Sequence, residues 1–128
     1  MRATKFGVAM GLAFGAACPA GAQLAPLAQQ MEINVSTPHP YTDNMNQTYR
    51  VRVPGARRVS VHIAKLETEV GYDMLEFLDG NNASYGTWQG TGSGGYGPWI
   101  EGDTVLLKFT TDGSVTMYGF DADHVLYE

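Results

Sequence analysis

The chain has 128 residues, with 13 acidic and 8 basic side chains and a formal net charge of −5. This balance argues against nucleic acids and anionic membrane surfaces as partners, because both are themselves negatively charged. It fits a soluble extracellular domain or a protein that binds cations.

The first 22 residues have the features of an export signal. Arg2 and Lys5 form a basic start, an apolar stretch covers residues 6–17, and AGA at residues 20–22 offers a small-residue cleavage site. The apolar stretch is short and interrupted by glycines, which disfavours a retained membrane helix. We therefore predict a signal peptide over residues 1–22. The mature protein is predicted to be secreted or periplasmic, with no membrane insertion after cleavage.

The only cysteine, Cys18, lies within this predicted signal. Export normally favours disulfides in small domains, so a mature chain without cysteine depends on packing, or on a metal ion, for its stability. Residues 23–30 are predicted to form a linker, and residues 31–128 a single domain.

Short segments in which apolar and polar residues alternate follow the linker. This period of two occurs at residues 48–53, 59–63, 72–78 and 105–109. Turn signals rich in Asp, Asn and Gly separate such segments at residues 79–82, 101–103 and 112–113. Beyond the signal no segment has a sustained helical period. The pattern predicts an all-β fold, a sandwich of two antiparallel sheets.

No motif indicates catalysis. GTGSGG at residues 90–95 matches G-x-G-x-x-G, but residues 96–99, YGPW, follow it where a nucleotide site needs a helix. We therefore expect a flexible loop between strands at this segment. His39, His62 and His124 are scattered along the chain, and His62 is expected on the exposed face of its strand. The protein is predicted not to be an enzyme.

Aromatic residues gather around the glycine-rich segment. Tyr85 and Trp88 precede it, and Tyr96 and Trp99 follow it. Core packing is the default role of such side chains. The alternative is a carbohydrate-binding platform made by Trp88, Tyr96 and Trp99, on which sugar rings stack.

Negative charge is concentrated in LETEVGYDMLEFLDG, residues 66–80. Its carboxylates belong to Glu67, Glu69, Asp73, Glu76 and Asp79. Carboxylates that lie close together repel one another unless they are protonated or a cation neutralises them. Glu76 and Asp79 are expected to face water and form a turn. Ordinary surface pairs with Lys65 and Lys108 are the alternative to a bound cation.

Three segments together resemble the CUB domain, in particular its bacterial, cysteine-free form. They are STPHPYTDN at residues 36–44, LETEVGYDMLEFLDG at residues 66–80, and DTVLLKFTTDGSVTMYGF at residues 103–120. The resemblance covers nearly the whole predicted mature chain. It implies a compact, jelly-roll-like β-sandwich that recognises proteins or carbohydrates outside the cell and has no catalytic role.

The resemblance also implies a calcium site. In many CUB domains one Glu and two Asp bind the ion, at positions that match Glu67, Asp73 and Asp112 here. The tyrosine that steadies the Glu in those domains corresponds to Tyr41. The spacing from Glu67 to Asp73 is shorter than in familiar animal members, so Glu69 is the alternative to Glu67.

Calcium chemistry agrees with such a site. Calcium takes six to eight oxygen ligands, typically carboxylates from separate loops together with backbone carbonyls and water. Carbonyls near Ser114, beyond the turn that Asp112 opens, could supply some of these oxygens. We therefore predict a secreted, calcium-binding recognition module for an extracellular protein or glycan. A carbohydrate-binding module that uses the aromatic residues is the alternative.

Overall fold

A computed structural model describes residues 28–128. The predicted signal peptide, residues 1–22, lies outside these residues, as do residues 23–27 of the predicted linker. The strands are β1 (Gln29–Ser36), β2 (Asn46–Arg52), β3 (Arg58–Glu67), β4 (Met74–Asp79), β5 (Ser84–Trp88), β6 (Thr91–Tyr96), β7 (Ile100–Glu101), β8 (Thr104–Thr110) and β9 (Gly119–Tyr127).

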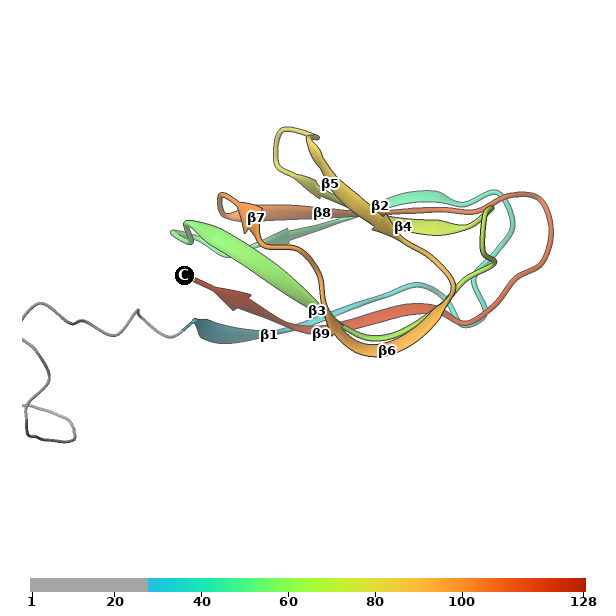
Figure 1. The fold of residues 1–128 in the computed structure, drawn as a ribbon, viewed down its shortest axis with the longest axis horizontal. Coiled ribbons are helices and arrows are strands. Elements are labelled where there is room, and N and C mark those ends of the chain that lie inside the picture. The colour runs from blue at the N-terminus through green and yellow to red at the C-terminus, as the bar shows by residue number, and fades with distance from the viewer. Residues whose placement is uncertain (1–27) are drawn as a thin grey trace, which may run out of the picture.

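The strands form two layers that face each other (Figure 1). One sheet has the order β1-β9-β3-β6, with the short β7 also paired to β3, and the other has the order β2-β8-β4-β5. All the strand pairs are antiparallel. The prediction of an all-β, jelly-roll-like antiparallel sandwich is confirmed. Within residues 28–128 there is no helix long and apolar enough to cross a membrane.

The core lies between the sheets, where the alternating apolar residues meet. Val59, Val61 and Ile63 of β3 are buried, as are Leu75 and Phe77 of β4. Each fully buried side chain of this size contributes about 1.5–3 kcal/mol relative to exposure. Because the described residues contain no cysteine, this packing carries the stability that disulfides provide in many exported domains.

The glycine-rich segment was expected to be a loop, and that expectation is wrong. Residues Thr91–Tyr96 form β6, which pairs with β3. Glycine disfavours strands in general, but pairing with β3 supplies the backbone hydrogen bonds here. At Gly97, just after β6, a Cβ atom would lie 2.6 Å from a ring carbon of Phe77. The missing side chain at Gly97 therefore allows the backbone to approach the core closely.

Strand β1 begins inside the predicted linker. Gln29 pairs with Tyr127, and Gln30 with Leu126, on β9. The ordered domain therefore begins before residue 31, because backbone pairing with β9 holds these polar residues in a strand.

Three connections lie together at one end of the sandwich, on the right of Figure 1. They are residues 37–45 between β1 and β2, residues 68–73 between β3 and β4, and residues 111–118 between β8 and β9. These segments are far apart in the sequence, and together they carry the predicted metal ligands.

Candidate functional site

Asp73 is the centre of the loop end. Its side chain is fully buried, and its Oδ2 accepts a hydrogen bond of 2.6 Å from the hydroxyl of Tyr41. Its Oδ1 accepts a hydrogen bond of 2.9 Å from the backbone N–H of Asp112. One buried carboxylate therefore ties the three connections together.

A tight turn brings Glu69 over Asp73. The carbonyl of Glu69 accepts hydrogen bonds from the backbone N–H groups of Tyr72, at 3.2 Å, and Asp73, at 3.0 Å. Gly71 has a φ of 88°, a left-handed value that glycine adopts without steric cost. Its N–H donates to Oε1 of Gln89 at 2.6 Å, which fixes the turn to the strand connection beside it.

Glu69, Asp73 and Asp112 form a carboxylate cluster in which one oxygen of each lies within 4.8 Å of the others. Oε1 of Glu69 is buried and has no hydrogen-bond partner among the described residues. Burial, together with the negative charges of Asp112 and Asp73, raises the pKa of the Glu69 carboxyl above its ordinary value. The cluster therefore gathers three acidic groups around a buried oxygen that has no partner among the described residues.

The donor set suits a hard cation. Carboxylate oxygens are the ligands that calcium prefers. The buried, unpartnered Oε1 of Glu69 is a ligand atom that no protein group occupies among the described residues. Burial, followed by the hydrogen bond to Asp73, raises the pKa of the Tyr41 hydroxyl. Tyr41 thus remains a neutral donor that orients Asp73.

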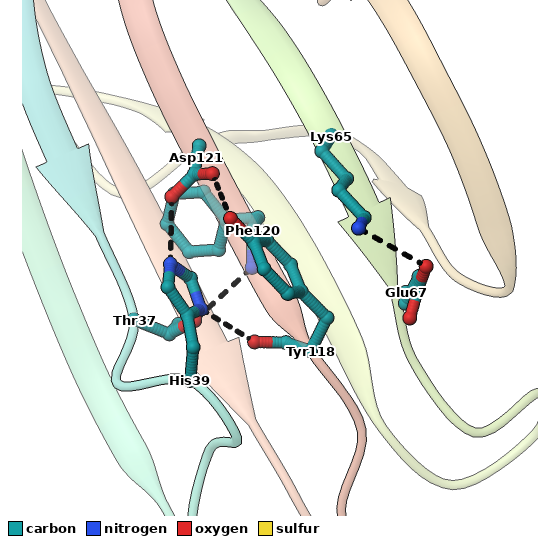
Figure 2. A network of polar contacts seen from close by, with 7 residues as sticks. All are labelled: Thr37, His39, Lys65, Glu67, Tyr118, Phe120 and Asp121. Atoms are coloured by element: carbon teal, nitrogen blue, oxygen red, sulfur yellow. Dashed lines mark hydrogen bonds and ion pairs between the residues drawn. The ribbon is translucent and has the colours of Figure 1, made fainter.

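Glu67 does not join the cluster. It lies at the end of β3, and its Oε2 is 3.5 Å from Nζ of Lys65. Figure 2 shows these two side chains pointing toward each other. Lys65 also sits over the ring of Tyr118, 4.1 Å from the centroid. Glu67 is still within the strand and points away from the core, opposite Leu66, whereas Glu69 lies beyond the strand end, where the chain turns toward Asp73. Of the two alternatives, the structure brings Glu69 to the other carboxylates.

The other predicted supporting residues, Tyr41 and Ser114, also contact the cluster. The N–H of Glu69 is 3.4 Å from the hydroxyl of Tyr41, so Tyr41 touches the backbone of Glu69 and the carboxylate of Asp73. The N–H of Ser114 donates to Oδ1 of Asp112 at 3.3 Å. Ser114 therefore helps to position Asp112. A role for carbonyls near Ser114 as ligands stays a prediction.

Three exposed apolar side chains on the connections that carry the cluster were not predicted as functional. Val70 and Tyr72, on either side of Gly71, are 68% and 62% exposed, and Val115 on the neighbouring connection is 54% exposed. The alternating pattern placed Tyr72 at the start of a strand, but β4 begins only at Met74. A signal was available in the sequence, since Val70 and Tyr72 flank the turn residue Gly71, and connecting segments lie at the surface.

The aromatic residues of the alternative sugar platform have separate neighbours. Trp88 of β5 packs edge-on against Phe77, with ring centroids 5.0 Å apart. It also lines a pocket of about 170 Å³ beside β6. Tyr96 of β6 lies against the ring of His62, and Trp99, between β6 and β7, lies beneath the guanidinium of Arg58 at 4.3 Å.

The fold and the loop cluster together define a class of protein, a jelly-roll-like β-sandwich with an acidic cluster held on loops at one end. The family model of the CUB domain matches residues 26–124, and the chain belongs to this family. CUB domains are protein–protein recognition modules, generally non-catalytic and mostly extracellular.

Among curated proteins, the chain is 33% identical over 92 residues to the E3 ubiquitin-protein ligase HERC2 of Homo sapiens and of Mus musculus. It is 31% identical over 96 residues to the human zinc finger ZZ-type and EF-hand domain-containing protein 1. These matches cover 67% and 70% of this chain but 2% and 3% of the relatives. The chain thus spans a very small part of each of them.

Solved structures show the same fold. The CUB1-EGF-CUB2 domain of human MASP-1/3 has a TM-score of 0.62 at 19% identity, covering 77% of this chain and 42% of that one. The CUB1-EGF-CUB2 domains of rat MASP-1 have a TM-score of 0.59 at 21% identity, covering 77% and 40%. At these identities the likeness establishes the fold alone.

Proposed function

We propose that this CUB domain is a secreted recognition module that binds one calcium ion through Glu69, Asp73 and Asp112. The observation that carries the proposal is the buried, unpartnered oxygen of Glu69 beside two further carboxylates. A calcium ion would satisfy that oxygen, offset the mutual repulsion and fix the three connections relative to one another.

An extracellular protein is the partner that the loop end favours. Val70, Tyr72 and Val115 expose apolar surface on the connections that carry the carboxylates. A protein can cover such side chains and also place a basic side chain against the acidic ligands. The overall acidic charge favours a partner with a basic patch, because opposite charges speed the association of two proteins.

Secretion is supported by the basic and apolar start of the sequence and by the extracellular setting of most CUB domains. The exported protein is then expected to begin at Gln23. Mass spectrometry of the protein recovered outside the cytoplasm checks this. A retained Met1, or a lipid on Cys18, contradicts it.

Calcium dependence of the folded state tests the proposal directly. Binding to the native state alone adds about 2.7 kcal/mol at a calcium concentration one hundred times the Kd. For a domain of this size the melting temperature should rise by about 10 °C and fall again in chelator. Asp112→Ala should remove the response, whereas Glu76→Ala, across from Lys108 in the middle of β4, should keep it. Loss of the response in both variants, or in neither, contradicts the assignment.

Partner capture tests recognition. Proteins from the native extracellular fluid should be retained by the wild type in calcium and released by chelator. Asp112→Ala should retain none of them. Binding that persists in chelator and in Asp112→Ala would place recognition elsewhere on the domain.

A carbohydrate-binding module remains the second candidate, favoured by the pocket that Trp88 lines beside β6. Glycan-array binding that Trp88→Ala abolishes, with the melting temperature unchanged, would support it. We expect Trp88→Ala instead to destabilise the fold by about 2 kcal/mol, because Trp88 packs against Phe77.

A further inference from the structure

A second group of metal-ligating side chains lies on the sheet that contains β3 and β9. His62 of β3 and His124 of β9 are direct cross-strand partners. Their rings are stacked, with centroids 4.3 Å apart and planes 18° from parallel. Together with Asp123 they offer three ligand atoms that lie within 4.8 Å of one another. The scattered histidines of the sequence thus include two that meet in space.

A β-bulge brings Asp123 into this group. His62 pairs with His124 and Ile63 pairs with Ala122, which leaves Asp123 without a partner on β3. In a regular strand, neighbouring residues point to opposite faces, but an extra residue in one strand changes where its side chain points. Ala122 and Val125 face the core, whereas Asp123 and His124 both point outward.

Both imidazoles are directed at one carboxylate oxygen. Oδ1 of Asp123 is 2.7 Å from Nδ1 of His62 and 3.0 Å from Nδ1 of His124. The histidine side chains are 16% and 15% exposed, and that of Asp123 is 51% exposed. The nitrogens are therefore held in place by packing, while the carboxylate side is open to an ion from solution.

Tyr96 contacts the other ring nitrogen of His124, the one that does not face Asp123. Its hydroxyl oxygen lies 2.7 Å from Nε2 of His124. When a metal occupies Nδ1 of a neutral histidine, Nε2 carries the hydrogen and needs an acceptor, which the Tyr96 oxygen provides. Metal-binding histidines are usually fixed by a hydrogen bond from the other ring nitrogen in this way.

We propose that His62, Asp123 and His124 bind a first-row transition-metal ion, with zinc as the natural probe. Two imidazole nitrogens and one carboxylate oxygen make a three-ligand set that zinc accepts, with a fourth position left for water. Calcium prefers an all-oxygen site, so it should favour the carboxylates of the loop end. Zinc binding does not depend on the calcium proposal, since the two sites share no residue.

Calorimetric titration of zinc into the full chain without a histidine tag tests this proposal. Excess calcium in the buffer keeps the loop carboxylates occupied. The expected result is one zinc ion per chain. Cobalt(II) provides a second readout, because tetrahedral coordination by nitrogen and oxygen gives a strong visible absorption.

Variants locate the ion. Tyr96→Phe removes the acceptor for His124 and should weaken zinc binding by about 10- to 100-fold. His62→Ala and His124→Ala should weaken it more than that. His39→Ala is the matched control, because His39 also pairs with an aspartate, Asp121, at 2.8 Å, and it should leave zinc binding unchanged.

Asp123→Asn guards against a folding artefact, because it keeps the size of a half-exposed side chain and removes its charge. It should fold, as judged by an unchanged far-ultraviolet circular dichroism spectrum, and should bind zinc more weakly. The absence of heat and of cobalt absorption in the wild type overturns the proposal. Zinc binding that is unchanged in His62→Ala and His124→Ala also overturns it.

Discussion

The acidic cluster at the loop end and the histidine cluster on the sheet each contain three side chains that can bind a metal ion. They differ in whether those side chains have hydrogen-bond partners within the protein. At the loop end all three groups are carboxylates, and Oε1 of Glu69 is buried without a partner. On the sheet, Nδ1 of each imidazole lies within hydrogen-bond distance of Oδ1 of Asp123, so that carboxylate oxygen has two partners. The loop end is therefore expected to depend on a cation for its stability, whereas the histidine cluster is stable without one.

The largest effect is expected from removing the central carboxylate of the loop end. Asp73→Ala leaves the Tyr41 hydroxyl and the Asp112 N–H without acceptors in a buried position. Each unsatisfied group costs about 1–3 kcal/mol, so the free energy of unfolding should fall by about 3 kcal/mol or more. Urea denaturation in chelator measures this change.

Asp123→Ala is the matched control for Asp73→Ala, because it removes the central carboxylate of the histidine cluster. Asp123 is half-exposed, and water can replace its hydrogen bonds, so the loss should stay below about 1 kcal/mol. Equal losses in the two variants would break the distinction between the clusters.

The pH dependence of the melting temperature of Glu69→Gln gives a further test of the difference between the two clusters. The raised pKa of Glu69 means that its ionised form is less favourable in the metal-free fold than in the unfolded chain. This unfavourable contribution is present above the raised pKa and disappears as the pH falls toward the ordinary value, about 4.3. Without calcium the Gln variant should therefore melt above the wild type at neutral pH, and the difference should vanish near pH 4. In saturating calcium the order should reverse, because only the wild type has the full ligand set.

Tyr72→Ser should change stability least. The side chain is 62% exposed, so the free energy of unfolding should change by less than about 0.5 kcal/mol, and calcium binding should be retained. Capture of the protein partner should nevertheless weaken if the apolar rim of the loop end contacts it. Undiminished capture would separate the partner surface from the calcium site.

Much of the loop end was predictable from the sequence, because its residues lie in the segments that resemble the CUB domain. Asp73, Asp112 and Tyr41 do meet, but the Tyr41 hydroxyl donates to Asp73 and touches only the backbone N–H of the Glu that the resemblance implied it steadies. The choice between Glu67 and Glu69 depended on where β3 ends, since residues within the strand and beyond it point in different directions. A strand boundary is a local detail that periodicity does not fix to within one or two residues.

The histidine cluster could not be predicted in the same way. His62 and His124 are partners only because β9 lies between β1 and β3, an order set by the whole sandwich. The outward direction of Asp123 depends on a bulge that carries no glycine or proline signal in the sequence. The glycine-rich β6 was missed for a related reason, because pairing with β3 outweighs the poor strand propensity of its residues.

Calorimetric titration of calcium into the chelator-stripped wild type, Glu69→Gln and Glu67→Gln tests the central claim most directly. The two variants remove the same charge two residues apart, one in the acidic cluster and one paired with Lys65. We predict one calcium ion bound by the wild type and by Glu67→Gln with similar affinity, and a large loss of affinity in Glu69→Gln. Absence of heat in the wild type at millimolar calcium, or a loss confined to Glu67→Gln, would contradict the account.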